Sequence, residues 1–257
     1  MTGRPEQRSD HVARQDRFYR DGAHTHLQAR VDDPYAARIA ERLARSLDMK
    51  AEDRVLEVGA GFGRFTFPLL SYCASVVALD LSARTLETLE RVRDERGIPE
   101  ERCRPVCGDV DALDAGTVGA PFDHVVGFFF LHHLADHAAT LRRLSHWVAP
   151  HGGMGFVEPN RRNPLFAMQV LICPDMSWRE EQGMFRLTRP RVEAAYRAAG
   201  FDDIRSQTFG FFPPQIVNPL RAARRLEDRL EKLRPLHWIL PFLLLSARRP
   251  QAGRRGS

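Results

Sequence analysis

Three glycines at alternate positions follow a short apolar run in the first quarter of the chain. Residues 55–58 have the character of a buried strand, and Gly59, Gly61 and Gly63 follow directly. Glycine lets the backbone turn tightly and lets a ligand lie against it, because it has no Cβ atom. A helical pattern follows over residues 64–72, and the start of a helix presents free N–H groups and a positive dipole end. The stretch predicts a site for a nucleotide-like molecule with a carboxylate or phosphate.

Two common nucleotide-binding patterns do not fit this turn. The dinucleotide pattern G-x-G-x-x-G requires a third glycine where this chain has Arg64, which disfavours a nicotinamide-dependent dehydrogenase. The phosphate-binding loop requires a Lys-Ser or Lys-Thr pair, and none follows here. What remains is an acidic residue, Glu57, followed by x-G-x-G-x-G. In this pattern the chain resembles the class I S-adenosylmethionine-dependent methyltransferases, whose first motif has this form.

Two further carboxylates stand at the ends of predicted strands. Asp80 follows an apolar run at residues 75–79, and Gly108-Asp109 follows a run at residues 104–107. In an open α/β sheet, ligands lie beyond the carboxyl ends of the strands. The Asp80 carboxylate can there accept hydrogen bonds from both hydroxyls of a ribose, the alternative being that it only caps the next helix.

The resemblance implies a role toward S-adenosylmethionine for each of these positions. It implies that Asp109 accepts a hydrogen bond from the adenine amino group, and that Leu81 and the Val110 N–H contact the ring. Glu57 would lie near the amino group of the cofactor, or would instead tie the turn to the next helix. The implied cofactor-binding residues are Glu57, Gly59, Ala60, Gly61, Asp80, Leu81, Gly108, Asp109, Val110 and Phe128.

Histidines and a glutamate follow on the next two predicted strands. His132 and His133 come after the run at residues 122–128, and Glu158 ends the run at residues 154–158. We take these three as candidate catalytic residues, because an imidazole or a carboxylate can remove a proton from a phenol or hydroxyl. The alternatives are packing and helix capping for the histidines, and a hydrogen bond to a loop for Glu158.

The histidines also raise a rival hypothesis, a metal-dependent hydrolase. His133 and His137 are four residues apart, a spacing at which two imidazoles can share a zinc ion. No third ligand is evident beyond the adjacent His132, so we expect no metal site. The resemblance also counts against a DNA or amide target, because the Asn/Asp-Pro-Pro-aromatic sequence usual there in such enzymes is replaced by residues 128–131, Phe-Phe-Phe-Leu.

Apolar residues gather after the fifth predicted strand, where this family places its variable substrate lid. An apolar lid excludes water and suits a small hydrophobic acceptor, whereas core packing is the alternative. The candidate substrate-binding residues are Tyr19, His132, Asn160, Met168, Trp178, Phe185 and Phe212.

Predicted strands alternate with predicted helices, which implies right-handed crossovers and an open parallel sheet. We predict an α/β, Rossmann-like class I methyltransferase fold. It has a seven-stranded, mostly parallel sheet, an antiparallel last strand as in the family, and helices on both faces. The expected organisation is an N-terminal, partly disordered lid (1–33), a methyltransferase domain (34–247) with lid or insert elements (159–187 and 212–235), and a disordered basic tail (248–257). Other expected elements are a helix capped by Asp33-Pro34, a helix capped by Ser82, a helix over 136–148, a turn at 150–153, and strands over 204–211 and 238–247.

Residues 219–234 form a helical pattern with an apolar stripe. A packed helix is the expectation. A dimer face or a membrane-surface contact is the alternative, because arginines decorate the other side. The stripe is Leu220, Ala223, Leu226, Leu230 and Leu233, and the arginines are Arg221, Arg224, Arg225 and Arg229.

Composition is that of an ordinary soluble protein, with 43% hydrophobic and 28% charged residues in 257. The net charge of +5 is modest, and no nucleic-acid groove is evident. The four cysteines lack paired metal spacing, which favours reduced thiols in a cytoplasm. The polar, charged N-terminal residues lead us to expect no signal peptide, and no run approaches the roughly 20 apolar residues of a spanning helix. We expect a cytoplasmic protein without stable membrane insertion.

Together these features predict transfer of the S-adenosylmethionine methyl group to a small, largely apolar acceptor. A natural product, quinone or lipid-like molecule of secondary metabolism fits, with oxygen, nitrogen and carbon all open as the methylated atom. Positioning and desolvation supply most of the rate of such a displacement, and a base is needed only if the acceptor is protonated. A non-catalytic module that binds S-adenosylmethionine is the alternative, and a homodimer is left open.

Overall fold

Seven strands form one sheet in the order β3-β2-β1-β4-β5-β7-β6. The computed structural model describes residues 33–164 and 186–249. The strands are β1 (Arg54–Val58), β2 (Ser75–Asp80), β3 (Cys103–Cys107), β4 (Phe122–Phe128), β5 (Val148–Pro159), β6 (Asp203–Phe209) and β7 (Phe242–Arg248). Strands β1 to β5 pair in parallel, whereas β7 runs antiparallel to both β5 and β6. The predicted sheet, with its antiparallel last strand, is confirmed.

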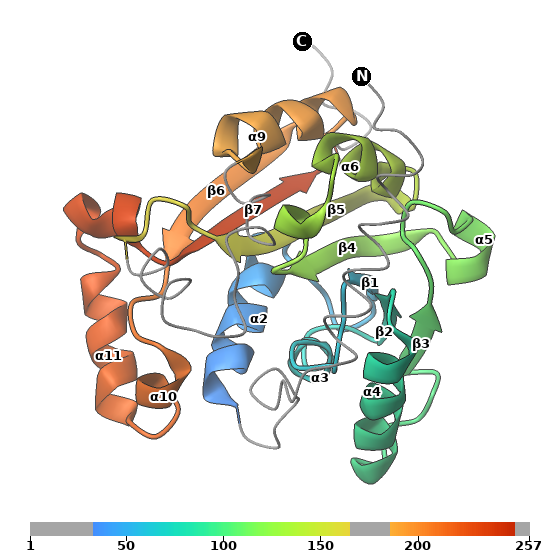
Figure 1. Cartoon of the computed structure of the whole chain (residues 1–257), viewed down its shortest axis with the longest axis horizontal. Coiled ribbons are helices and arrows are strands. Elements are labelled where there is room, and N and C mark those ends of the chain that lie inside the picture. Colours follow the sequence, from blue (N-terminus) through green and yellow to red (C-terminus); the bar gives the residue numbers. More distant parts are fainter. Residues whose placement is uncertain (1–32, 165–185, 250–257) are drawn as a thin grey trace.

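Helices cover both faces of this sheet (Figure 1). They are α2 (Pro34–Ser46), α3 (Thr66–Leu69), α4 (Ala83–Glu95), α5 (Ala115–Val118), η2 (Leu131–His133), α6 (His137–Ser145), α9 (Arg189–Ala198), α10 (Pro214–Val217), α11 (Arg221–Leu230) and η3 (Arg234–Ile239). Helices α2, α3 and α4 lie on one face, and α6 and α9 on the other (Figure 1). Successive strand residues point to opposite faces, so Val55 joins the core under α2 and Leu56 the core under α6.

Helix α2 begins as the sequence predicts and packs closely on the centre of the sheet. Asp33 is its N-cap, with Oδ1 accepting a hydrogen bond from the Ala36 N–H (3.1 Å), and Pro34 stands in its first turn. A Cβ atom at Gly155 of β5 would lie 2.5 Å from Leu43 Cδ1. The missing side chain at Gly155 therefore lets α2 approach the strand.

The predicted turn at residues 150–153 lies inside β5, which begins at Val148. The pairing of β5 with its neighbours β4 and β7 explains why the strand begins earlier than predicted. β7 pairs with β5 from Gly153 onward, and the register between β4 and β5 shifts between Phe122 and His124. The strand thus absorbs the irregular stretch as a bulge, which the local turn sequence does not reveal.

The last strand begins at Phe242, later than the predicted residues 238–247. The side-chain amide of Asn160 donates to the carbonyls of Trp238 (3.0 Å) and Leu240 (2.7 Å). These hydrogen bonds hold the stretch before β7 out of the sheet. Residues up to Ile239 form η3 instead.

The helix predicted over residues 219–234 is shorter than expected and faces differently. It ends at Leu230, and Pro235 then interrupts any continuation. Of its apolar stripe, Leu220, Leu226 and Leu233 are exposed, so the expectation of a packed stripe is wrong for these three. Within the described ranges, none of the helices is both long and apolar enough to span a bilayer.

Candidate functional site

Strand β1 ends in a turn whose backbone suits glycine. Gly59 and Gly61 have φ angles of +71° and +51°, which strain residues that carry a Cβ. The Gly59 N–H donates to the Leu79 carbonyl of β2 (2.8 Å). A Cβ atom at Gly61 would meet nothing within 4 Å, whereas one at Gly59 would lie 2.5 Å from Phe130 Cδ2. The turn is therefore open at Gly61 and covered by Phe130 at Gly59.

The carboxylate of Asp80, at the end of β2, closes this turn. Its Oδ2 accepts a hydrogen bond from the Gly61 N–H (2.8 Å), and its Oδ1 accepts from the Ser82 N–H (2.9 Å) and Thr85 Oγ1 (3.3 Å). Burial raises the pKa of Asp80, although these hydrogen bonds act in the opposite direction. A carboxylate has about four acceptor positions, so Oδ2 retains capacity beside the open Gly61. Ser82 occupies the N-cap of α4 but makes no capping bond with its side chain.

Glu57 lies on β1 just before the turn and is buried. Thr66 Oγ1, at the start of α3, donates to its Oε2 at 2.5 Å. Burial and the nearby charge of Asp80 raise the pKa of Glu57 to about 8, against the effect of the Thr66 hydrogen bond. Glu57 thus ties the turn to α3, which is shorter than the predicted helix. A cation bound beside Glu57 would favour its ionised form. Thr66 had no signal in the sequence that would have identified it.

The end of β3 brings the predicted Gly108-Asp109-Val110 stretch beside Asp80. The Gly108 N–H donates to the Asp80 carbonyl (2.8 Å). Asp109 Oδ1 accepts a hydrogen bond from the Asp111 N–H (2.9 Å), and the side chain of Val110 is buried. Because β3, β2 and β1 are neighbours in the sheet, the three acidic positions lie along one edge, as predicted. Leu81, which follows Asp80 in the chain, is half-buried.

Phe128, the last residue of β4, and Phe130, in the turn that follows, differ in place, and the predicted role fits Phe130 better. The side chain of Phe128 is buried and stacks on Phe65, with ring centroids 4.4 Å apart. It belongs to the core, and Phe130 is the aromatic residue that covers Gly59. The sequence shows three consecutive phenylalanines at the end of β4, but it does not determine which of the three rings lies over the glycine turn.

Glu158, at the end of β5, binds the turn that follows β4. Its Oε1 accepts hydrogen bonds from the N–H groups of Phe130 (3.0 Å) and Leu131 (2.8 Å), and its Oε2 accepts from the His132 N–H (3.4 Å). The Nδ1 atom of His132 lies 2.6 Å from the same Oε2. Both side chains are buried, at 0% exposure for Glu158 and 4% for His132. The geometry matches the alternative of a loop contact for Glu158, made to the turn of a neighbouring strand.

The acceptor-only carboxylate also sets the state of the His132 ring. A hydrogen bond to it requires a proton on Nδ1, so in a neutral ring Nε2 is the basic atom. The His133 ring lies beside it, with centroids 4.0 Å apart. His132 and Glu158 are therefore brought together as a pair, with His133 adjacent.

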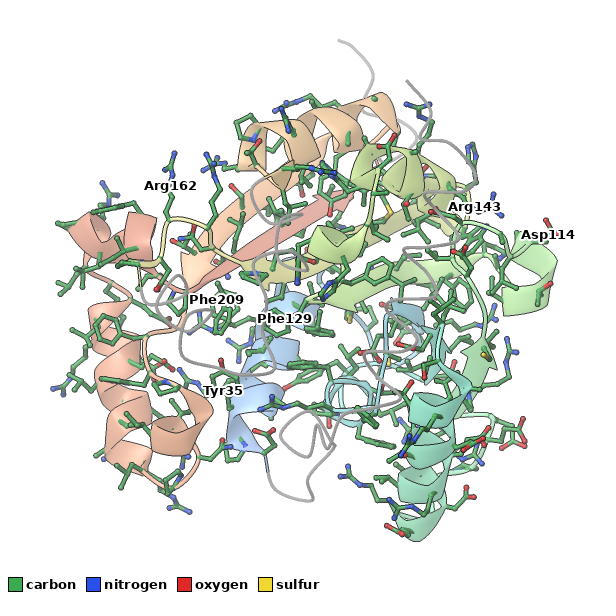
Figure 2. All side chains as sticks on the ribbon, in the orientation of Figure 1. Tyr35, Asp114, Phe129, Arg143, Arg162 and Phe209 are labelled. Carbon is green, nitrogen blue, oxygen red and sulfur yellow. The ribbon has the colours of Figure 1, made fainter. Side chains whose placement is uncertain are left out.

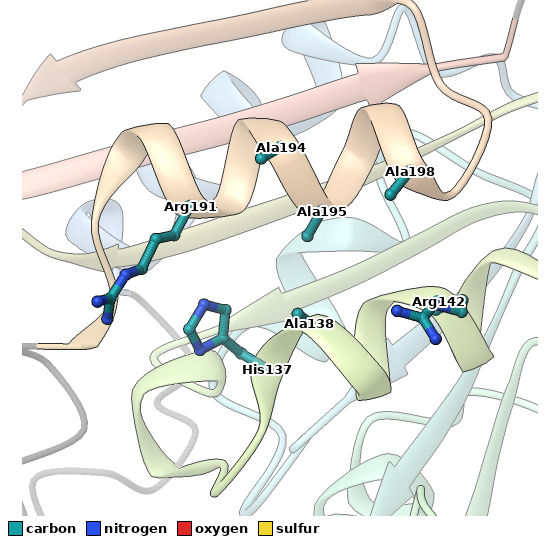
Figure 3. Close-up of a pocket in the computed structure, with 7 residues that line it drawn as sticks. All are labelled: His137, Ala138, Arg142, Arg191, Ala194, Ala195 and Ala198. Atoms are coloured by element: carbon teal, nitrogen blue, oxygen red, sulfur yellow. The ribbon is translucent and has the colours of Figure 1, made fainter. Parts of the chain in front are cut away.

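His137 lines a pocket of about 360 Å³ between α6 and α9 (Figure 3). Alanines form its walls, and Arg142 and Arg191 stand at its ends. Burial lowers the pKa of His137 despite the neighbouring Asp136. In the described part of the chain, no three His, Cys, Asp or Glu side chains are placed to hold a metal ion.

An aromatic cluster covers the carboxyl edge next to α2, and sequence reasoning missed most of it. Phe242 packs against Tyr35, Phe129 and Phe209, with ring centroids 6.1, 5.4 and 5.5 Å away. Figure 2 shows these last three side chains grouped beside α2. Phe129 has a φ of +55°, a strained value for an aromatic residue that often marks functional sites. Phe209 is buried in the core, and Tyr35, Phe129 and Phe242 are half-buried against it, so these three rings add apolar surface to this edge.

Arg64, at the third glycine place of the dinucleotide pattern, links the two parts of the edge. Its Nε donates to Asp33 Oδ2 (2.9 Å), and its guanidinium lies over the rings of Tyr35 and Phe65. The side chain thus joins the start of α2 to the helix after the glycine turn.

Three of the predicted substrate-binding residues lie in the described part of the chain: His132, Asn160 and Phe212. The Asn160 amide donates to two backbone carbonyls, and its Oδ1 accepts from the Arg162 N–H (3.1 Å). Its polar groups are thus engaged within the protein. Phe212 is half-buried against Phe211, with centroids 5.0 Å apart. Tyr19, Met168, Trp178 and Phe185 lie outside the described residues.

Comparison with known proteins adds an independent line of evidence. Residues 56–154 match a family model described as a methyltransferase domain. The chain is 28% identical over 187 residues to a ubiquinone biosynthesis O-methyltransferase of Paracidovorax citrulli, covering 68% of this chain and 77% of that protein. It is 32% identical over 92 residues to a ribosomal RNA small subunit methyltransferase A of Corynebacterium jeikeium, covering 34% of this chain and 28% of that protein.

A solved structure has the same fold along almost the whole chain. It is the N-methyltransferase NodS of Bradyrhizobium japonicum in complex with S-adenosyl-L-homocysteine. The TM-score is 0.59 at 15% identity, and the match covers 94% of this chain and 99% of that one. At this identity the likeness concerns the fold.

Proposed function

We propose that the carboxyl ends of β1, β2 and β3 bind S-adenosylmethionine. The chain belongs to the class I S-adenosylmethionine-dependent methyltransferase superfamily and is a methyltransferase with that cofactor. Open space at Gly61 would admit the ligand. Asp80 Oδ2 offers an acceptor for ribose hydroxyls, and the buried Glu57 carboxyl suits the cationic amino group. The remaining cofactor positions are Gly59, Ala60, Leu81, Gly108, Asp109 and Val110.

S-adenosylmethionine supplies a methyl group activated by its sulfonium. The task of the protein is then to hold the acceptor in line and to exclude water. The single observation that carries the cofactor assignment is Asp80, whose carboxylate holds the Gly61 N–H at 2.8 Å and keeps acceptor capacity on the same oxygen. In this proposal Asp80 Oδ2 accepts hydrogen bonds both from the glycine turn and from the ribose of the cofactor.

The acceptor that we propose is small and largely apolar: a natural-product, quinone or lipid-like molecule. Support comes from the cluster of Tyr35, Phe129, Phe209 and Phe242 on the same edge. The relative from Paracidovorax citrulli is named for ubiquinone biosynthesis, which agrees with this chemistry. A nucleobase is less favoured, because the Asn/Asp-Pro-Pro-aromatic sequence is absent after β4. A cytoplasmic location and a role in secondary metabolism belong to the same proposal.

If the acceptor is a hydroxyl, His132 is the base that we propose. Glu158 holds its Nδ1 at 2.6 Å, which leaves Nε2 as the basic atom of the neutral ring. Glu158 is then a positioning residue, because its carboxylate is occupied by backbone N–H groups and by the ring. Removal of a general base typically costs about 10²–10⁴-fold in rate, so His132→Gln should lower kcat by that order and flatten its pH profile.

Asp80→Ala tests the cofactor site in a calorimetric titration of the full chain with S-adenosylmethionine. The expected result is a loss of about 1–3 kcal/mol of binding free energy, roughly a 5- to 150-fold higher Kd. Asp114→Ala is the matched control, because Asp114 is exposed and makes no capping hydrogen bond with its side chain. NADH should not bind the wild type. Unchanged affinity in a folded Asp80→Ala protein would refute the placement of the site.

The acceptor is tested separately, by transfer of a labelled methyl group to a panel of hydroxylated quinones, catechols and fatty acids, with small RNA hairpins as the competing class. Transfer to one of the apolar acceptors supports the proposal. Transfer to RNA alone would overturn the acceptor class and leave the cofactor site intact.

A further inference from the structure

Helix α11 packs on the protein through its charged side. Glu227 is 4% exposed, and its Oε1 accepts hydrogen bonds from the N–H groups of Phe211 (2.7 Å) and Phe212 (3.0 Å). Its Oε2 pairs with Arg38 of α2 at 3.3 Å. One turn later, Glu231 accepts from the Gly210 N–H (2.7 Å) and pairs with Arg42 of α2. These contacts fix which side of the helix faces inward.

The apolar side chains of the same region face outward as a consequence. A surface helix normally turns its apolar stripe toward the core, and here the acidic side occupies that position. The exposed large apolar residues of the described chain all belong to this region: Ile216 (38%), Leu220 (54%), Leu226 (47%), Leu233 (50%) and Trp238 (60%). They come from α10, α11, η3 and the residues between them, which line one edge of the molecule (Figure 1). Such a cluster indicates an interaction site.

Positive charge accompanies the apolar residues. Five cations of the region, Arg221, Arg225, Arg229, Lys232 and Arg234, are exposed, and their side chains make no ion pair with another described residue. The acidic residues do not offset them, because Glu227 and Glu231 face inward and Asp228 pairs with Arg38 at 2.6 Å. We call the five apolar residues and these five cations the α11 surface.

We propose that the α11 surface docks on an anionic membrane surface, with α11 lying in the plane of the interface. Leucines and a tryptophan beside arginines are the composition of interfacial helices, in which the apolar side enters the acyl boundary and the cations meet lipid phosphates. A second copy of the chain fits less well, because a two-fold interface would bring the same arginines face to face. The charge therefore selects an anionic lipid surface as the occupant.

Docking there has a consequence for the candidate site. The backbone N–H groups bound by Glu227 and Glu231 belong to residues 210–212, directly after β6, and Phe209 at the end of β6 belongs to the aromatic cluster. A membrane-bound α11 would therefore stand one short loop away from the apolar edge. Binding itself does not depend on the identity of the acceptor.

Vesicle flotation with the full chain tests the docking. The probes are vesicles of phosphatidylcholine alone and of phosphatidylcholine with about one third phosphatidylglycerol, each at low and physiological salt. The wild type should float with the anionic vesicles, less so at higher salt. Two arginine charges near the surface correspond to roughly a 10- to 30-fold change in partitioning, so Arg225→Gln/Arg229→Gln should bind weaker by that factor. Leu226→Gln/Leu233→Gln should also lose binding.

Lys50→Gln/Arg142→Gln is the matched control, because it removes the same charge from exposed positions before β1 and on α6. It should bind like the wild type. Equal losses in the control and in the α11 variants, or no binding by the wild type at low salt, would overturn the proposal. The proposal would also be overturned if truncation of the chain after Arg249 abolished vesicle binding. A dimer in sedimentation velocity that Leu226→Gln/Leu233→Gln dissociates would overturn it in favour of a second copy.

Discussion

Two turns meet at the carboxyl edge of the sheet, and they are built in opposite ways. The turn after β1 bends because Gly59 and Gly61 adopt positive φ angles, a property of their own residue type. The turn after β4 has no glycine, and Phe129 there has a φ of +55° at a cost. Glu158 from the neighbouring β5 holds the three N–H groups that follow. The first turn is determined locally and the second by a distant carboxylate.

The two carboxylates beside these turns differ in the same sense. Glu57 accepts a hydrogen bond from Thr66 Oγ1, and burial raises its pKa to about 8. Glu158 is equally buried but receives three backbone N–H groups and the His132 ring. Burial disfavours the charged form of a carboxyl group, and each hydrogen bond donated to the carboxylate opposes that effect. Glu158 therefore holds the turn after β4 in place through its hydrogen bonds, whereas Glu57 carries a proton that it would release when a cation binds beside it.

The largest test of this contrast is Glu158→Ala. It would leave the buried N–H groups of Phe130 and Leu131 without an acceptor, so the free energy of unfolding should fall by about 3–5 kcal/mol. Urea denaturation measures the loss. Glu158→Gln, which keeps one acceptor oxygen, should lose less. Equal stability of Glu158→Ala and the wild type would show that the turn after β4 does not depend on the carboxylate.

A smaller effect tests whether the two turns touch. Gly59→Ala combines a positive φ with a Cβ that would lie 2.5 Å from Phe130 Cδ2, and about 2–3 kcal/mol of stability should be lost. Gly61→Ala has the strain without the contact and should lose about 1–2 kcal/mol. Adding Phe130→Ala should recover part of the loss in Gly59→Ala and none in Gly61→Ala, as a double-mutant cycle of unfolding free energies would measure. Purely additive changes in unfolding free energy would show that Gly59 and Phe130 do not interact.

The smallest expected effect is a pH dependence at Glu57. Its folded-state pKa of about 8 lies above the ordinary value of 4.5, so the folded chain holds a proton that the unfolded chain releases. Its contribution to stability is full below pH 4.5 and is lost as the pH rises through 8. Between pH 6 and pH 7 the wild type should lose up to about 1.4 kcal/mol relative to Glu57→Gln, which cannot ionise. Parallel stability curves of the two proteins over this range would contradict the raised pKa.

The arrangement of the strand ends that we propose for the cofactor could be predicted from the sequence, except that Phe128 belongs to the core. Each part depends on a local pattern: glycines after a strand for the turn, and a carboxylate at the end of the next strand for Asp80. Parallel pairing then brings strand ends to one edge without further information. The aromatic half could not be predicted, because Tyr35, Phe129 and Phe242 come from α2, the end of β4 and the start of β7. No spacing in the chain links them.

The sequence by itself determined the alternation of strands and helices, the glycine turn and the order of acidic residues along one edge, since these follow from side-chain periodicity and backbone freedom. Only the tertiary structure decided which partner each buried polar group would find. It gave Glu158 to the turn after β4, engaged Asn160 with the chain before β7, and turned the acidic side of α11 inward so that Leu226 faces out. The physical reason is that a buried carboxylate or amide must find its donors and acceptors wherever the fold brings them, and that requirement outweighed the apolar stripe of a short helix.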